Sequence, residues 1–216
     1  MATDTGAPTR GRARYEAETP LPAAATADME RWGARLAKWN SRINLVAPGT
    51  LDDFWVRHAL DSAQIVPLIA EDARTLADFG SGAGFPGLAV AIDAKHRGLP
   101  RHVHLIESAG KKASFLRTVI RELDLPATVH RERIEAVPPL QADAITARAF
   151  APLTRMIPLA RRHLRPDGQL VLLKGERLDD ELRAMEAAND VPIMVDRRRS
   201  LSDETGVIVS LALPGR

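Results

Sequence analysis

The sequence predicts an α/β protein with a Rossmann-like, mostly parallel sheet, an antiparallel C-terminal hairpin and an N-terminal helical segment. Three observations support this fold class. A short apolar run, 75–79, leads into a glycine-rich turn and then into a helix-compatible run, 86–95. Strand-like and amphipathic helical runs then alternate as far as residue 188, as in a sheet with helical crossovers. Finally, two strand-like runs flank a polar Ser-Asp-Glu-Thr-Gly connection, 202–206, as in an antiparallel pair.

The first 24 residues lack apolar periodicity and are rich in Ala, Thr, Pro, Gly and Arg. We expect residues 1–24 to form a disordered basic arm that can contact nucleic acid. Residues 25–70 are expected to form helices that pack on the main domain. The first begins at Ala27, and its apolar side chains recur three and four residues apart, at Met29, Trp32, Leu36, Trp39 and Ile43.

A second helix is predicted over 51–69, after the break at Pro48-Gly49. One stripe of this helix places the polar side chains of His58 and Asp61 among apolar ones. Arg57 and Asp61 are four residues apart and can form an ion pair on a helix. Two interpretations remain open: a salt-bridged helical segment, or polar side chains that face the substrate.

The main domain is expected to span 71–216. Its predicted strands are 75–79, 102–106, 127–131, 143–147, 169–173, 191–195 and 207–213. Its predicted helices are 86–95, 111–123, 153–164 and 178–188. Right-handed crossovers would make a parallel sheet whose strand order reverses between 75–79 and 143–147. A ligand is expected outside the carboxyl ends of those two strands.

Four glycines follow the first strand: Gly80, Gly82, Gly84 and Gly87. A strand, a glycine turn and a helix N-terminus form the nucleotide-binding corner of such a sheet. The spacing also matches a dinucleotide fingerprint, so an NAD-binding regulatory module is one interpretation. Asp78 favours another, because a carboxylate here would repel a pyrophosphate and attract a ligand that carries an ammonium and a sulfonium. S-adenosylmethionine is such a ligand, and we expect Asp78 to guard the entrance of the corner.

Other strand ends supply further candidate contacts. Glu107 follows the second strand and can accept hydrogen bonds from both ribose hydroxyls. After the third strand, Ile134 could pack on the adenine while Glu135 reads its amino edge. Arg148 follows the fourth strand and is either a structural clamp on carbonyls or a contact to ligand or phosphate. The predicted cofactor-binding residues from this reasoning are Gly80, Gly82, Glu107, Ile134, Glu135 and Arg148.

Composition excludes several kinds of chemistry. The 216 residues are 45% hydrophobic and 27% charged and include no cysteine, so disulfides, thiolate metal sites and cysteine nucleophiles are excluded. No metal site is predicted. No apolar run approaches the roughly 20 residues that span a bilayer, and the N-terminus lacks the apolar core of a secretory signal, so we expect a cytoplasmic protein without a membrane partner. Arginine clusters at 10–14, 161–165 and 197–199 suit phosphate recognition, although each could be a solvated face.

Two sequence features that known methylation reactions need are missing here, and their absence narrows the range of candidate methyl acceptors. Methylation of cytosine C5 needs a cysteine nucleophile. Methylation of exocyclic amines usually uses an Asn/Asp-Pro-Pro-aromatic tetrapeptide after the fourth strand, where residues 147–150 read Ala-Arg-Ala-Phe. A ring nitrogen such as guanine N7 has an in-plane lone pair and no proton to lose, so positioning alone can serve. No catalytic acid or base is assigned. A small-molecule methyltransferase remains the alternative.

Five segments carry a family resemblance: 39–45, 57–62, 78–87, 106–112 and 146–150. In order and spacing they resemble the RsmG (GidB) family of bacterial 16S rRNA guanine-N7 methyltransferases, over about residues 27–175. The motif from Asp78 to Gly84 also resembles the first motif of class I methyltransferases. The family resemblance implies a class I S-adenosylmethionine-dependent methyltransferase, with 71–216 as the cofactor-binding domain.

The resemblance also implies a site and a substrate. Cofactor contacts are implied at Gly80, Phe85, Ile134, Glu135 and Arg148, of which only Phe85 is not indicated by the strand ends. The implied reaction is methylation of guanine N7 in the decoding-region loop of 16S rRNA, in the small ribosomal subunit or an assembly intermediate, by an enzyme expected to be a monomer. The sequence departs from the family at Glu107, where aspartate is common, and in its longer arginine-rich N-terminus.

Overall fold

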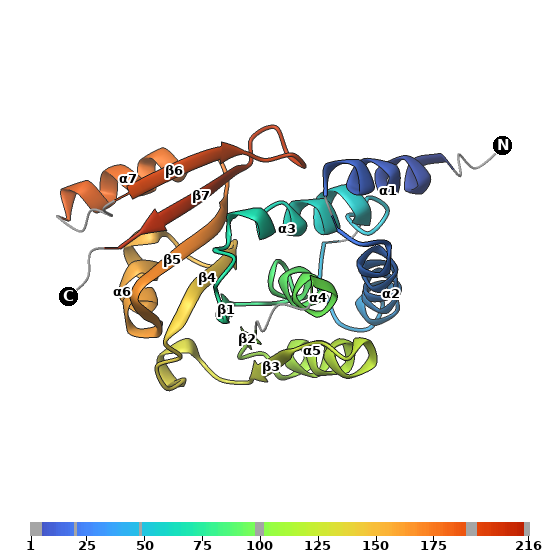
Figure 1. Ribbon diagram of the computed structural model, residues 1–216, viewed down its shortest axis with the longest axis horizontal. Helices are drawn as coiled ribbons and strands as arrows, with labels where there is room; N and C mark the ends of the chain where they lie inside the picture. Colours follow the sequence, from blue (N-terminus) through green and yellow to red (C-terminus); the bar gives the residue numbers. More distant parts are fainter. Residues whose placement is uncertain (1–5, 20, 48, 98–101, 189–193, 214–216) are drawn as a thin grey trace.

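The computed structural model describes residues 6–19, 21–47, 49–97, 102–188 and 194–213. Its centre is a seven-stranded sheet with the strand order β3-β2-β1-β4-β5-β7-β6 (Figure 1). The strands are β1 (Thr75–Phe79), β2 (His102–Ile106), β3 (Ala127–His130), β4 (Ala142–Arg148), β5 (Leu164–Lys174), β6 (Met194–Arg199) and β7 (Val207–Ala212). Strands β1 to β5 are parallel; β7 pairs antiparallel with β5, and β6 pairs antiparallel with β7 at the edge of the sheet. The predicted fold class is confirmed.

The carboxyl ends of the parallel strands meet at one edge of the sheet. Phe79 at the end of β1 is in register with Ile106 of β2 and with Ala147 of β4. Ile106 is in turn in register with His130 at the end of β3. Because β1 lies between β2 and β4, the strand order reverses beside it, and this is where an open α/β sheet binds its ligand.

Helices cover both faces of the sheet (Figure 1). Helices α4 (Gly87–Arg97) and α5 (Gly110–Leu123) lie on one face, with α2 (Ala23–Asn40) packed outside them, and α6 (Leu153–His163) and α7 (Leu178–Ala187) lie on the other. The strands separate two apolar cores: Leu76 joins the core under α4, whereas Ala77 and Phe79 join the core under α6. Burial on both faces explains why these strands are continuous apolar runs.

The N-terminal arm expected over residues 1–24 is corrected by the structure. Residues Gly6–Glu18 form a helix, α1, and α2 already begins at Ala23. Tyr15 is completely buried and packs on Trp55 with 5.2 Å between ring centroids. Arg12 lies 5.5 Å over the same Trp55 ring. Because Tyr15 is the one buried aromatic side chain described in α1, the spacing of apolar residues in the sequence does not indicate this helix. Residues 1–5 and 20 lie outside the described residues.

The helix predicted over 51–69 is a series of shorter elements. A π-helical segment, η1 (Phe54–Leu60), is followed by α3 (Asp61–Ala63) and a 3-10 turn, η2 (Val66–Leu68). The expected ion pair between Arg57 and Asp61 is not formed in the described part of the chain; Asp61 pairs with Arg148 instead. Wider helical turns change which side chains are neighbours, so i,i+4 reasoning does not hold here.

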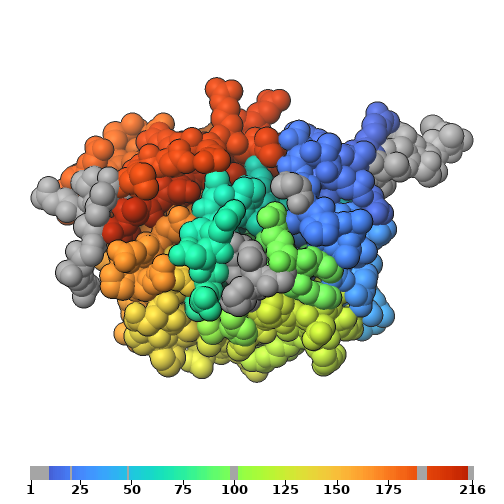
Figure 2. Space-filling model, viewed as in Figure 1, coloured from blue at the N-terminus to red at the C-terminus, as the bar shows by residue number. Residues whose placement is uncertain are grey.

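The C-terminal hairpin differs from expectation only in its bounds. Strand β5 begins at Leu164 instead of Gln169, with a register irregularity opposite Ala142. Strand β6 begins at Met194, and residues 191–193, predicted as its start, lie outside the described residues. The turn between β6 and β7 reaches the N-terminal helices, where Arg14 donates a hydrogen bond to the carbonyl of Leu201. In Figure 2 the red hairpin accordingly meets the blue α1 along one rim.

Candidate active site

The glycine turn after β1 is packed too closely for larger residues. Gly80 has φ +66° and Gly84 has φ +101°. An added Cβ would lie 2.6 Å from Cδ2 of Phe150 at Gly80 and 2.3 Å from Cδ1 of Leu88 at Gly84. Because glycine alone tolerates both the dihedral and the contact, the turn brings its backbone directly to the sheet edge.

Asp78 lies beneath this turn and not at its entrance. The side chain is completely buried, and its Oδ1 accepts a hydrogen bond of 2.9 Å from Oγ1 of Thr146. Its Oδ2 makes no hydrogen bond of acceptable geometry, and a Cβ added at Gly87 would lie 2.7 Å from it. The carboxylate therefore points under the start of α4. The expectation that Asp78 guards the entrance was wrong, because the side chain turns inward between β1, β4 and α4.

The buried carboxyl group of Asp78 still affects the electrostatics of the glycine turn. Burial raises the pKa of Asp78 to about 6, against the opposing effect of the hydroxyls of Ser81 and Thr146 and of the nearby Gly87 amide. Charges interact more strongly in a poorly hydrated site than in water. A cation bound above the turn would therefore favour the ionised form of Asp78 without touching it.

Glu107 connects the end of β2 to the glycine turn. Its Oε2 accepts a hydrogen bond of 3.0 Å from the amide of Gly82, and its Oε1 accepts one of 2.7 Å from the amide of Ala109. The side chain is only 8% exposed. An ionised carboxylate can accept about four hydrogen bonds, so two remain for ribose hydroxyls. Glu107 thus lies beside the glycine turn, and its contact with the ribose hydroxyls stays a prediction.

A small pocket of about 90 Å³ lies at the ends of β1, β2 and β3. It brings together four predicted residues: Gly80, Glu107, Ile134 and Glu135. A glycine, a fixed carboxylate and an apolar side chain fit an adenosyl group chemically. The Phe150 ring, which packs over Gly80, forms part of the pocket wall.

Arg148 and Phe85 lie on the other side of the turn. The guanidinium of Arg148 lies 4.4 Å over the Phe85 ring and pairs with Oδ2 of Asp61 at 3.0 Å. It also donates a hydrogen bond of 3.3 Å to the carbonyl of Arg57. These contacts support the interpretation of Arg148 as a structural clamp. The side chain keeps 24% exposure and lines the cleft described below, so it can also contact a ligand.

His58 is buried against Phe85. The two rings stack with 4.6 Å between centroids and an interplanar angle of 16°. Nε2 of His58 lies 3.1 Å from Oγ1 of Thr50, which itself donates to the carbonyl of Ala47. Because the threonine proton is already used, Nε2 must be the donor, and the neutral ring carries its proton there.

His58 and Asp61 both line a cavity of about 390 Å³, together with Arg57 and Arg148. Burial, followed by the charges of Arg148 and Arg57, lowers the pKa of His58 to about 4, so the ring is neutral at pH 7. Of the two interpretations left open by the sequence, the local Arg57–Asp61 ion pair is absent among the described residues. Both polar side chains do face a cavity.

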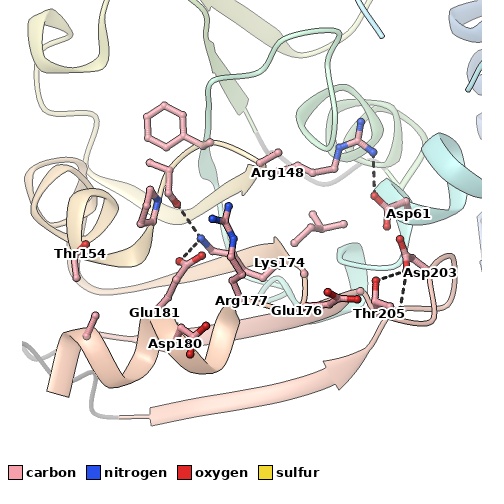
Figure 3. Close-up of a pocket in the computed structure, with 18 residues that line it drawn as sticks. Asp61, Arg148, Thr154, Lys174, Glu176, Arg177, Asp180, Glu181, Asp203 and Thr205 are labelled. Carbon is pink, nitrogen blue, oxygen red and sulfur yellow. Dashed lines mark hydrogen bonds and ion pairs between the residues drawn. The ribbon is translucent and has the colours of Figure 1, made fainter. Parts of the chain in front are cut away.

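A larger open cleft of about 930 Å³ runs from Arg148 along the end of β5 to α7 (Figure 3). Lys174 at the end of β5 pairs with Glu181 at 2.7 Å and donates a hydrogen bond of 2.9 Å to the carbonyl of Ala151. Sequence reasoning missed Lys174. Its position at the carboxyl end of a parallel strand was the available signal, because such ends line the ligand site.

Each arginine cluster has at least one member that pairs with a carboxylate. Arg12 pairs with Glu16 and Glu30 in the first cluster. Arg165 pairs with Asp143 at 2.6 Å in the second. In the third, Arg197 pairs with Asp179 at 2.5 Å on a strand, β6, that is exposed throughout. Any phosphate contact by these arginines must compete with the pairs.

Comparison with known proteins decides the family. A family model described as rRNA small subunit methyltransferase G matches residues 25–202. The chain belongs to this family. A Paramagnetospirillum magneticum protein named ribosomal RNA small subunit methyltransferase G is 49% identical over 176 residues, 82% of each chain. A Rhodospirillum rubrum protein of the same name is 44% identical and covers 91% of this chain and 94% of its own. The resemblance read from the five segments is confirmed.

Solved structures with low identity share the fold. A SAM-dependent methyltransferase from Aquifex aeolicus has a TM-score of 0.57 at 16% identity, over 82% of this chain and 98% of its own. A geranyl diphosphate methyltransferase in complex with GPP and sinefungin also has a TM-score of 0.57, at 14% identity, over 88% and 98%. These neighbours show the fold, which is that of class I methyltransferases. Membership of the methyltransferase G family makes the protein an S-adenosylmethionine-dependent methyltransferase. In the described part of the chain, no helix is both long and apolar enough to cross a membrane.

Proposed function

We propose that this enzyme transfers the methyl group of S-adenosylmethionine to N7 of a guanine in the decoding-region loop of 16S rRNA. The substrate is the small ribosomal subunit or an assembly intermediate, and the enzyme acts in the cytoplasm as a monomer. Relatives named for ribosomal RNA small subunit methylation support the substrate. The observation that carries the proposal is that the pocket with Glu107 and the open cleft with Arg148 and Lys174 adjoin at one sheet edge, with Phe150 lining both.

The cofactor would be held across the glycine turn. Glu107 would accept the ribose hydroxyls with its free lone pairs, and Gly82 would keep that carboxylate in place through its amide. Ile134 and Glu135 would contact the adenine from the end of β3, and Gly80 would leave room for the backbone to approach the ligand. Phe85 and Arg148 would border the methionyl side of the turn.

The bound cofactor supplies an electrophilic methyl group on a sulfonium. Guanine N7 needs no general base, because its lone pair is free and no proton is lost. The contribution of the protein is to align N7 with the methyl carbon, and well-oriented reactants can gain up to about 7–11 kcal/mol in this way. Arg148 and Lys174 would hold the nucleotide from the open cleft of about 930 Å³.

Transfer of labelled methyl groups tests this function. Small subunits and protein-free 16S rRNA that lack the modification are incubated with enzyme and labelled cofactor, and the modified base is mapped. The matched control is rRNA with 7-deazaguanine at the mapped position, which keeps the base-pairing edge and removes N7. We expect transfer to guanine and none to the 7-deaza base. Equal labelling of both, or labelling of small molecules alone, would contradict the proposal.

A further inference from the structure

The tip of the β6–β7 hairpin binds the carboxylate of Asp61. Oγ of Ser202 donates a hydrogen bond of 2.6 Å to Oδ1 of Asp61. Nε2 of Gln64 lies 3.1 Å from the same oxygen. Ser202 is thus the closer of the two partners of this oxygen, and it comes from the far end of the chain.

The other oxygen of Asp61 binds Arg148. Oδ2 lies 3.0 Å from the guanidinium of Arg148. Figure 3 marks this ion pair with a dashed line. Asp61 therefore links the hairpin to the arginine that stacks on Phe85 at the glycine turn. Fixing one carboxylate oxygen fixes the plane of the group, and the plane decides where the second oxygen can hold a guanidinium.

The hairpin tip is itself held in place. The amide of Leu201 donates a hydrogen bond of 2.7 Å to Oε1 of Gln64, and Nε2 of Gln64 lies 2.9 Å from Oγ of Ser200. Arg14 of α1 donates to the carbonyl of Leu201. Contacts from two other segments thus hold the serine hydroxyl at a defined position.

We propose that Ser202 is a positioning residue for the active site, orienting Arg148 through Asp61. The inference deepens the proposed function and rests on it, since Arg148 is there a cofactor and nucleotide contact. Without the hydroxyl, Asp61 keeps only Gln64 on Oδ1, and its broad terminal torsion can rotate. Arg148 then loses its fixed direction at the turn. The contacts of this hydroxyl with Oγ of Ser200, at 2.8 Å, and with Nε2 of Gln64, at 3.4 Å, are lost as well, while the sheet and the other hydrogen bonds of the hairpin remain.

Three variants separate positioning from folding. Ser202→Ala removes the hydroxyl, and Ser202→Thr retains one. Ser114→Ala is the matched control, because the exposed Ser114 hydroxyl donates to the carbonyl of Gly110 within α5 and lines neither the pocket nor the cleft. The measurements are cofactor affinity by calorimetry, methyl transfer to small subunits, and the melting temperature. We expect Ser202→Ala to lose about tenfold in affinity or transfer, the size typical of a lost hydrogen bond to a charged group. Ser202→Thr should restore most of the loss, and Ser114→Ala should change neither quantity.

A double-mutant cycle with Asp61→Ala shows whether the hydroxyl acts through the carboxylate. In the Asp61→Ala background, Ser202→Ala should cause no further loss. The proposal is overturned if Ser202→Ala behaves as wild type, or if its full tenfold loss persists without Asp61. Absence of rRNA methylation by the wild-type enzyme would instead refute the proposed function, and the affinity measurements would still decide the role of Ser202.

Discussion

The two sides of the glycine turn are built in different ways. On the pocket side, Gly80, Glu107 and Ile134 come from the ends of consecutive parallel strands, and Glu107 is held by the backbone amides of Gly82 and Ala109. On the cleft side, Asp61, Arg148 and Ser202 come from the start of α3, the end of β4 and the terminal hairpin, and they hold one another by side chains. Local sequence and topology set the first side, whereas long-range contacts set the second.

The largest expected effect tests the claim that the pocket side is made of closely packed backbone. Gly84→Ala should lower the free energy of unfolding by about 3 kcal/mol or more, from the left-handed dihedral together with the clash with Leu88. Gly49→Ala is the control, because Gly49 has φ +81° but nothing within 4 Å of an added Cβ. Denaturant unfolding measures both. Equal losses in the two variants would mean that crowding at the turn is unimportant.

A second prediction concerns Asp78 and pH. Its folded-state pKa of about 6 is above the ordinary value of 3.8, so its stabilising contribution is complete below pH 3.8 and is lost as the pH rises through 6. From pH 4 to pH 8, wild type should lose roughly 2.5 kcal/mol relative to Asp78→Asn. Unfolding of both proteins across this range measures the difference. A constant difference would place Asp78 in a hydrated setting.

The raised pKa of Asp78 also predicts that cofactor affinity depends on pH. S-adenosylmethionine carries a sulfonium, and S-adenosylhomocysteine does not. The ratio of their affinities should therefore shift toward the cation as the pH rises through 6, and this shift should vanish in Asp78→Asn. Calorimetry at pH 5 and pH 7.5 gives the ratio. If the ratio is independent of pH in wild type, the buried carboxylate does not sense the methyl donor.

Glu107→Ala should weaken cofactor binding by about 2 kcal/mol, roughly thirtyfold, because ribose hydroxyls and two backbone amides lose an ionised acceptor. Glu107→Asp is the informative comparison, since it keeps the charge on a shorter side chain and should retain part of the affinity. Calorimetry with S-adenosylmethionine measures both variants. Wild-type affinity in Glu107→Ala would show that the small pocket is not the adenosyl site.

The smallest expected effect comes from replacing two arginines of β6. Replacing Arg197 and Arg198 by Ala should weaken RNA binding and reduce the slope of log affinity against log salt by at most about 0.7–0.9 per phosphate contact. The effect is limited because both arginines already pair with aspartates. Replacing Arg117 and Arg121 on α5 removes the same charge elsewhere and is the control. An equal change in both pairs would indicate general attraction and no docking on the hairpin.

Sequence reasoning succeeded where structure is local. The alternation of apolar strand-like runs with amphipathic helical runs, together with the turn residues between them, located every parallel strand. The position of Glu107 directly after β2 located this residue at the carboxyl edge of the sheet, near the glycine turn. Sequence reasoning failed where contacts between segments distant in the sequence determine the structure. Helix α1 depends on one buried side chain, Tyr15, and the Asp61 pair changed partners because η1 is π-helical. Ser202 reaches Asp61 across 141 positions, a contact that no pattern in a single sequence reports.

A crystal structure with S-adenosylmethionine bound would test the division of the site most directly. We expect the ribose hydroxyls within hydrogen-bonding distance of the Glu107 carboxylate, the adenine beside Ile134, and the methyl group directed into the cleft of Arg148 and Lys174. A cofactor bound outside the glycine turn, or one whose methyl group faces away from that cleft, would contradict the assignment.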